Sequence, residues 1–239
     1  MNKLKLFPLL VATATCVSTS HATEATDEST IPTGELTVSA ISSARNIKPE
    51  LSWDIKHPAP PLEDLIDEKP NGDVKTKAKL KVEVSMLGTG ITDNYGTQYP
   101  SLTKMKFGGS WKKIFKGKGS QVVPSQVLVT QIVPKDTVIK LKTKDASDDG
   151  YDYPWILSSS SEVKIFYNGD TPPSNPRSNA HASTAAEYMK PYIVNGKLAL
   201  GAYDFIYAAE ITHTSDNIDS LGYDLQDAIV HVRVTLIEE

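Results

Sequence analysis

Residues 33–41 have the sequence T-G-E-L-T-V-S-A-I. Leu36, Val38 and Ala40 alternate there with threonine and serine, so an extended strand would present one apolar and one polar face. Such a strand can remain in its own chain as an ordinary first strand of a β-sandwich. It can also leave and add to the edge of a neighbouring chain, which is β-strand addition. These residues leave both alternatives open.

The other end of the chain alternates in the same way. Between residues 228 and 237, valine and leucine occupy every second position over four repeats. The side chains expected on the apolar face are Val230, Val232, Val234 and Leu236. His231 and Arg233 are expected on the opposite, solvent face. A strand of this kind at each end, with β-rich sequence between, predicts an antiparallel sandwich whose terminal strands close its edges.

Further alternating runs fill the region between the two ends. Residues 51–56, L-S-W-D-I-K, predict a strand with Trp53 in the core, and residues 77–86 form the most regular run of the chain. Residues 156–167 are expected to form one strand, and residues 180–189 a short helix. We therefore expect an all-β protein of about nine or ten strands with one or two short helices.

The first 22 residues are expected to be a signal peptide. Lys3 and Lys5 precede an apolar stretch, and small residues stand before the expected cleavage point. The apolar stretch is shorter than the roughly 20 residues that a membrane span needs. We therefore expect an exported protein with an N-terminal extension, residues 23–41, and one domain, residues 42–239.

Removal of that peptide would also remove Cys16, the only cysteine. The fold would then depend on core burial, strand pairing or oligomerisation instead of disulfides. Of the 25 basic residues, all but Lys3 and Lys5 would remain, which leaves 23 against 29 acidic residues and a net charge of −6. This balance does not favour a nucleic-acid partner.

No group of residues has the pattern of a catalytic or metal site. The four histidines outside the predicted signal peptide are not at metal-ligand spacing, and the chain has no G-x-S-x-G sequence. The aspartates of residues 145–152 depart from the calcium-binding loop pattern, so a solvated acidic turn is expected there. We therefore expect no enzyme activity, no metal and no cofactor.

Residues 104–118, K-M-K-F-G-G-S-W-K-K-I-F-K-G-K, combine six lysines with three aromatic residues on an otherwise acidic chain. Aromatic rings stack on sugars and lysines attract anions, so an acidic glycan is one candidate partner. The residues expected to contact it are Lys104, Lys106, Trp111, Lys112 and Lys113. The alternative is a strand pair with buried aromatic rings and lysines that extend outward along an exposed edge.

Several of these segments together resemble a known family. They are T-G-E-L-T-V-S-A-I, L-S-W-D-I-K and K-L-K-V-E-V-S, followed near the end by N-G-K-L-A-L-G-A-Y-D-F-I-Y-A-A-E-I-T and I-V-H-V-R-V-T-L. This order is similar to that of the K-eighty-eight (F-four) class of enterobacterial fimbrial subunits and adhesins, which the chaperone–usher pathway assembles. The similarity covers the two ends of the chain and not its middle.

The resemblance implies an immunoglobulin-like sandwich that lacks one strand and has short helices in an insertion. A periplasmic chaperone would lend the missing strand, and at the outer-membrane usher the next subunit would replace it by donor-strand exchange. Leu36, Val38 and Ala40 would be the donor side chains. The neighbouring subunits would form a cell-surface fimbrium that binds host glycans, with the receptor site within residues 145–192.

Two other functions are consistent with an exported β-rich chain. A periplasmic chaperone of fimbrial assembly would have two immunoglobulin-like domains and a basic cleft, whereas this chain has no evident linker between halves and is acidic. A secreted, non-fimbrial β-sandwich that acts as a binding module is the second.

Overall fold

The computed structural model describes residues 32–38, 51–56, 59–173, 181, 183–213 and 223–237. They belong to two compact units, Met1–Ala59 and Pro60–Glu239. The predicted signal peptide, Ala40 and most of the predicted N-terminal extension lie outside the described residues.

In the first unit, β1 (Thr33–Val38) and β2 (Leu51–Lys56) form an antiparallel two-stranded ribbon. Leu36 lies opposite Trp53, so the alternating apolar positions of both strands share one face of the ribbon. Trp53 is 66% exposed and Ile55 is 54% exposed. The expectation that Trp53 lies in the core is wrong, because the described residues of this unit provide no second layer to cover the ribbon.

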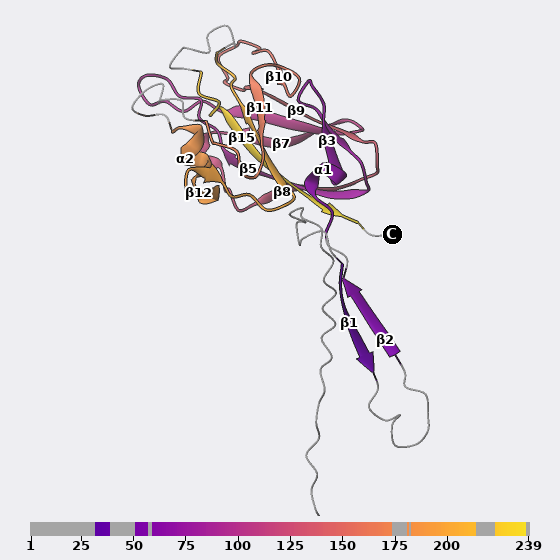
Figure 1. The fold of residues 1–239 in the computed structure, drawn as a ribbon. Coiled ribbons are helices and arrows are strands. Elements are labelled where there is room, and N and C mark those ends of the chain that lie inside the picture. The colour runs from indigo at the N-terminus through magenta and orange to yellow at the C-terminus, as the bar shows by residue number, and fades with distance from the viewer. Residues whose placement is uncertain are drawn as a thin grey trace, which may run out of the picture. The chain divides into compact units, whose positions relative to one another are not determined.

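The second unit is mostly β, with two antiparallel sheets packed together, as expected (Figure 1). The first sheet contains, in spatial order, β3 (Ile66–Glu68), β4 (Val74–Thr76), β9 (Val138–Asp145), β6 (Ser101–Phe107) and β7 (Trp111–Gly117), and β10 (Ile156–Leu157) also pairs with β9. The second sheet contains β11 (Val163–Phe166), β14 (Asp204–Ala209), β15 (Ala228–Leu236), β5 (Leu80–Gly88) and β8 (Val127–Val133).

Short elements complete this unit. They are the helices α1 (Leu62–Leu65) and α2 (Ala185–Met189), the 3-10 turns η2 (Gly119–Gln121) and η3 (Lys190–Tyr192), and a small hairpin of β12 (Ile193–Val194) and β13 (Lys197–Leu198). The helix α2 begins with a capping box in which Thr184 and Glu187 satisfy each other's backbone N–H groups. It confirms the C-terminal half of the predicted helix; residue 180, where that prediction began, lies outside the described residues.

The main core lies between the two sheets. The first sheet contributes Met105 and Leu141, and the second contributes Val84, Phe205 and Val232, all fully buried. Each side chain of this size stabilises the fold by roughly 1.5–3 kcal/mol when it is removed from water. The alternating patterns of the sequence therefore point their apolar sides into one common core.

The last strand, β15, lies inside its sheet, between β14 and β5. Val232 lies opposite Phe205 on one side and Val84 on the other. Val230, Val232 and Val234 are fully buried, and Leu236 packs against the same core. The expectation that the terminal strand closes an edge is wrong, because both of its hydrogen-bonding sides are already paired within the chain.

The second sheet is also covered on its other face. Ile206 and Ile229 point away from the main core and pack with Met189 of α2 and Leu198 of β13 in a second apolar cluster. Figure 1 shows α2 and β12 near each other on one side of the second unit. Strand β14 is consequently buried along its whole length.

This second layer overturns the expectation of a solvent-facing His231. The imidazole stacks on the ring of Tyr192, with the ring centroids 5.3 Å apart, and its Nε2 lies 3.1 Å from Asp204 Oδ2. Arg233 donates two hydrogen bonds to the same carboxylate, at 2.7 and 2.8 Å. Burial alone would raise the pKa of Asp204, but these donors hold it well below its ordinary value.

The predicted single strand over residues 156–167 is wrong. It is divided between β10 in the first sheet and β11 in the second. The turn between them is held by Ser158, whose buried hydroxyl donates a 2.7 Å hydrogen bond to Asp73. This contact crosses to a distant part of the chain, so the local pattern does not reveal it.

Candidate functional site

The outer face of the first sheet is set by the alternation of its strands. Met105 on β6 and Ile139 and Leu141 on β9 are fully buried against the second sheet. Their neighbours on the same strands must therefore point to the opposite face. On β9 these neighbours are Lys140, Lys142 and Lys144.

The pairing register gathers lysines from three adjacent strands. Lys104 on β6 lies opposite Lys113 on β7 and Lys142 on β9; we call these three residues the central row. On one side of it, Lys106 lies between Trp111 and Lys140, and on the other, Leu102 lies between Lys116 and Lys144. The lysine face comprises Lys104, Lys106, Lys113, Lys116, Lys140, Lys142 and Lys144 with Trp111 and Trp155.

Two tryptophans hold the lysine ammonium groups in place. The Nζ of Lys142 lies 4.5 Å from the ring centroid of Trp111 and 4.2 Å from that of Trp155. Lys104 and Lys144 approach the Trp155 ring as well, at 5.2 and 5.3 Å. The negative ring faces attract these cations, and each such contact is worth about 0.5–1 kcal/mol at an exposed site.

The face keeps uncompensated positive charge. Asp73 pairs with Lys140 at 2.7 Å, and Asp152 pairs with Lys144. Within the described residues, the central row and Lys106 have no carboxylate partner. Burial, and then the charges of Lys104 and Lys144, lowers the pKa of Lys142. Like charges directly opposite each other in a sheet are destabilising, so the fold carries this cluster at an energetic cost.

We predict that Lys142→Met raises the melting temperature. The methionine keeps the apolar contact between the two rings, since its thioether also packs well on aromatic groups. It removes the repulsion from the neighbouring lysines, so the free energy of unfolding should rise by about 0.5–1 kcal/mol. Thermal unfolding at low salt measures this. The exposed Lys135→Met is the control, and a lower melting temperature for Lys142→Met alone would contradict the prediction.

Four of the five predicted glycan-contact residues come together on this face: Lys104, Lys106, Trp111 and Lys113. Lys112 does not belong to it, because it lies opposite the inward Met105 and donates a 2.5 Å hydrogen bond to Gln131 of β8.

The sequence reasoning missed Trp155 and the three lysines of β9. The run K-L-K-T-K at residues 140–144 carries a signal for those lysines, since lysine occupies every second position there. A search for charged alternation, alongside apolar alternation, would have found it. Nothing in the local sequence around Trp155 indicates its position over this face.

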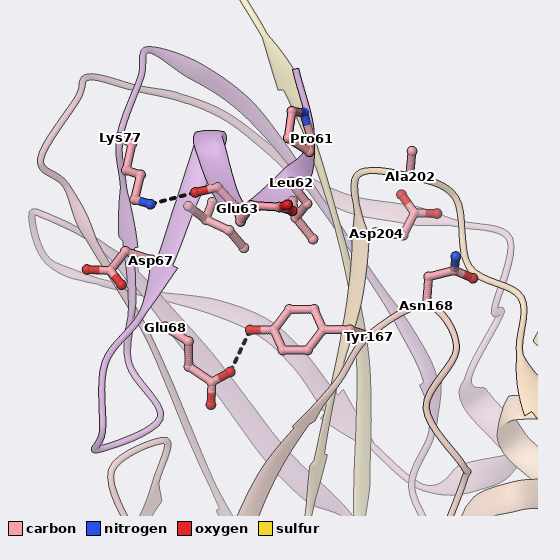
Figure 2. Close-up of a pocket in the computed structure, with 11 residues that line it drawn as sticks. Pro61, Leu62, Glu63, Asp67, Glu68, Lys77, Tyr167, Asn168, Ala202 and Asp204 are labelled. Carbon is pink, nitrogen blue, oxygen red and sulfur yellow. Dashed lines mark hydrogen bonds between the residues drawn. The ribbon is translucent and has the colours of Figure 1, made fainter. Parts of the chain in front are cut away.

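A groove of about 580 Å³ lies on another side of the same unit (Figure 2). Leu62 and Ile66 supply apolar lining, and Tyr167 donates a 2.8 Å hydrogen bond to Glu68 across the opening. Burial, and then this hydrogen bond, raises the pKa of Tyr167. The groove is lined by β3 and by Tyr167 and Asn168, which directly follow β11 in the chain. In the described part of the chain, β3 and β11 are edge strands of their sheets.

Three carboxyl groups, those of Glu210, Asp224 and Asp227, are buried at one end of the second sheet. Glu210 is fully buried, and it accepts hydrogen bonds from the backbone N–H groups of Thr212, His213, Asp224 and Leu225. Both carboxyl oxygens of Asp224 are buried and have no hydrogen-bond partner among the residues that the structure describes. Among the described residues, no group of His, Cys, Asp and Glu is arranged to hold a metal ion.

The predicted donor residues and the C-terminal strand are placed differently. Leu36 lies on the exposed face of the ribbon, Val38 occupies the same strand, and Ala40 lies outside the described residues. The C-terminal strand residues Val230, Val232 and Val234 lie in the main core, and Leu236 packs against it.

The comparisons with known proteins gave no match: no family model matches the chain, and no curated protein or solved structure is significantly similar to it. None of the helices within the described ranges is long and apolar enough to cross a membrane. Fold and site together define a mostly β protein with a concentrated cationic face.

Proposed function

We propose that this chain is a subunit or adhesin of a cell-surface fimbrium and attaches to anionic glycans of a host surface through the lysine face. The observation that carries the proposal is the uncompensated central row, Lys113, Lys104 and Lys142, on a chain of net negative charge. A cluster of like charges lowers the stability of the fold, so a contribution to stability does not explain its presence. Binding of an anionic ligand does explain it.

The tryptophans support the same function. Trp111 and Trp155 keep the ammonium of Lys142 between them before any ligand arrives. A cation that is already positioned loses less side-chain entropy on binding than one on a free side chain. The face is therefore organised for anion binding rather than left as a solvated edge.

Charge reversal on the face tests attachment. We predict that Lys104→Glu with Lys142→Glu lowers binding to anionic cell-surface glycans by about tenfold or more, because two favourable charge contacts become repulsive. Surface binding of the full chain at several salt concentrations measures this. Lys79→Glu with Lys164→Glu changes the net charge equally at exposed positions and is the control. Equal losses for both pairs would sink the proposed site.

Assembly by strand donation belongs to the same proposal. A two-stranded ribbon is only marginally stable by itself in water, and the exposed side chains of Leu36, Trp53 and Ile55 favour its pairing elsewhere. An immunoglobulin-like sandwich completed by a donated strand would need a free sheet edge with an apolar floor. The groove beside β3 and β11 has this combination and is our candidate acceptor.

The central position of β15 restricts where a donated strand can add. Because β14 and β5 occupy both sides of β15, the acceptor must lie at a sheet edge. Partners in this assembly would be neighbouring subunits, a periplasmic chaperone that covers the acceptor first, and an outer-membrane usher. A contact that passes from each subunit to the next without closing builds a fibre.

Two alternatives differ in what they require. A periplasmic chaperone would need two immunoglobulin-like domains, whereas residues 60–239 belong to one compact unit whose two sheets share a core. A secreted binding module that stays monomeric would bind glycans through the lysine face without assembling. The state of assembly, measured as described in the Discussion, separates this module from a fimbrial subunit.

A further inference from the structure

We infer that the lysine face is specific for sulfated polysaccharides over carboxylated ones such as polysialic acid, with the sulfate groups lying along the central row. This inference rests on the proposed attachment to anionic glycans. It concerns which anionic group is recognised and where it lies.

The free charge is concentrated in one place. Lys113, Lys104 and Lys142 belong to three adjacent strands, which lie about 4.8 Å apart in a sheet, so the row spans about 10 Å at the backbone. Of the β9 lysines on either side of the row, Lys140 is paired with Asp73 and Lys144 with Asp152. An anion therefore gains most along the central row.

A second feature keeps the anion away from one end of the face. A cavity of about 470 Å³ there is lined by Lys116 and Lys144, but also by Asp145, Asp148 and Asp152. These carboxylates offset the lysines and repel an anionic sugar. The polysaccharide is consequently expected to cross β7, β6 and β9 beside this cavity without entering it.

The chemistry of the side chains selects the anion. Planar carboxylates are matched best by the guanidinium fork of arginine, which makes two parallel hydrogen bonds. The lysine face has no arginine; Arg233, in the second sheet, is engaged with Asp204. Lysine ammonium is a compact point charge that suits the oxygens of a tetrahedral sulfate from any direction.

The face also lacks the groups that would recognise one particular sugar. The central row and the two rows beside it occupy nine positions on β7, β6 and β9. Seven of these positions are lysine, one is Trp111 and one is Leu102, so none has a hydroxyl or amide side chain. Recognition must then depend on charge density. Highly sulfated polysaccharides such as heparin carry more charge per sugar than polysialic acid does, so they benefit more from a row of three cations.

The experiment compares three polysaccharides of similar length against the full chain at physiological salt. They are heparin, heparin whose sulfates have been removed while its carboxylates remain, and polysialic acid. We expect heparin to bind about tenfold or more tightly than either of the others, because only sulfates supply enough charge along the row. Calorimetry or surface binding gives the affinities.

Variants locate the site. Lys104→Gln, Lys113→Gln and Lys142→Gln together should lower heparin affinity about tenfold or more, since three favourable charges are lost. Lys79→Gln, Lys135→Gln and Lys164→Gln remove the same charge at exposed positions elsewhere and should change it less than about twofold. A melting curve of each variant verifies that it is folded.

The other outcomes separate attachment to anionic glycans, which is the proposed function, from specificity for sulfate, which is the further inference. If polysialic acid binds as tightly as heparin, attachment to anionic glycans stands and sulfate specificity is wrong. If no polysaccharide binds, both are wrong. Tighter binding to phosphatidylserine vesicles than to heparin would assign the face to an anionic membrane and overturn the inference.

Discussion

Leu36→Asp is expected to abolish assembly of the protein into chains and, because the acceptor then stays empty, to lower the melting temperature of the second unit. Leu36 is 43% exposed on the apolar face of the β1–β2 ribbon, opposite Trp53. A donated strand fills the pockets of its acceptor with alternate side chains, so a carboxylate at this position would be buried without a partner. Burying an unpaired charge costs several kcal/mol, which is enough to prevent the exchange.

Thr37→Asp is the matched control for this variant. It introduces the same carboxylate one position later, on the polar face of the same strand. Light scattering after size-exclusion chromatography measures assembly, and calorimetry measures the melting of the β-sandwich. A peptide spanning residues 31–44 should raise that melting temperature when it is added to the Leu36→Asp variant, because the acceptor is then empty. If Leu36→Asp assembles as well as Thr37→Asp, strand donation by β1 is refuted, and a monomeric binding module becomes the better interpretation.

The second large effect is expected at the buried carboxyl groups, where two similar substitutions should act in opposite directions. Glu210→Gln should lower the free energy of unfolding by about 3 kcal/mol, since charged acceptors of hydrogen bonds contribute about 1.5–3 kcal/mol each and Glu210 serves several N–H donors. Its two oxygens join residues 212–213 to residues 224–225. An amide in its place would direct its own N–H groups toward some of those donors.

Asp224→Asn should instead stabilise the protein above neutral pH. Burial, and then the charge of Glu210, raises the pKa of Asp224 to about 7. An unfolded aspartate has a pKa near 3.9, so between about pH 4 and pH 7 the folded state holds a proton that the unfolded state has lost. Stability therefore falls as the pH rises through this range. Asparagine does not ionise, so the free energy of unfolding of the Asp224→Asn variant should exceed that of the wild type by about 2 kcal/mol or more at pH 8.

Urea unfolding at pH 5 and pH 8 measures both variants. The gain from Asp224→Asn should be small at pH 5 and large at pH 8, whereas the loss from Glu210→Gln should be present at both. Burial also raises the pKa of the neighbouring Asp227, with further contributions from Glu210 and Asp224. Some pH dependence should thus remain in the asparagine variant. A wild-type pH dependence that survives unreduced in Asp224→Asn would show that another group causes it.

The corrected expectations have a common cause. Trp53 and His231 occupy positions in alternating strands, and alternation states only that two faces differ. Whether a face is covered depends on another layer. The described part of the first unit provides no second layer for the ribbon of β1 and β2. In the second unit, α2, η3 and the β12–β13 hairpin cover the face of the second sheet that local polarity marks as solvated.

The candidate site shows the same division. Lys104, Lys106, Trp111 and Lys113 could be selected from the sequence because they are close together in one unusual segment. Lys142 could not be joined to them, since the pairing of β6 with β9 connects parts of the chain that are far apart. The role of Trp155 depends on a loop that places its ring over those strands.

The sequence by itself determined the clearly alternating strands, such as β5 and β15, and their apolar sides, because a pleated backbone points alternate side chains to opposite faces whatever its neighbours are. It also determined that the lysines of residues 104–118 are unusual for this chain. Only the tertiary structure decided that β15 is central, that seven lysines form one face, and that Glu210 lies among backbone donors. These facts depend on which strands pair and in which register. That choice follows from the packing of the whole core, which no local segment encodes.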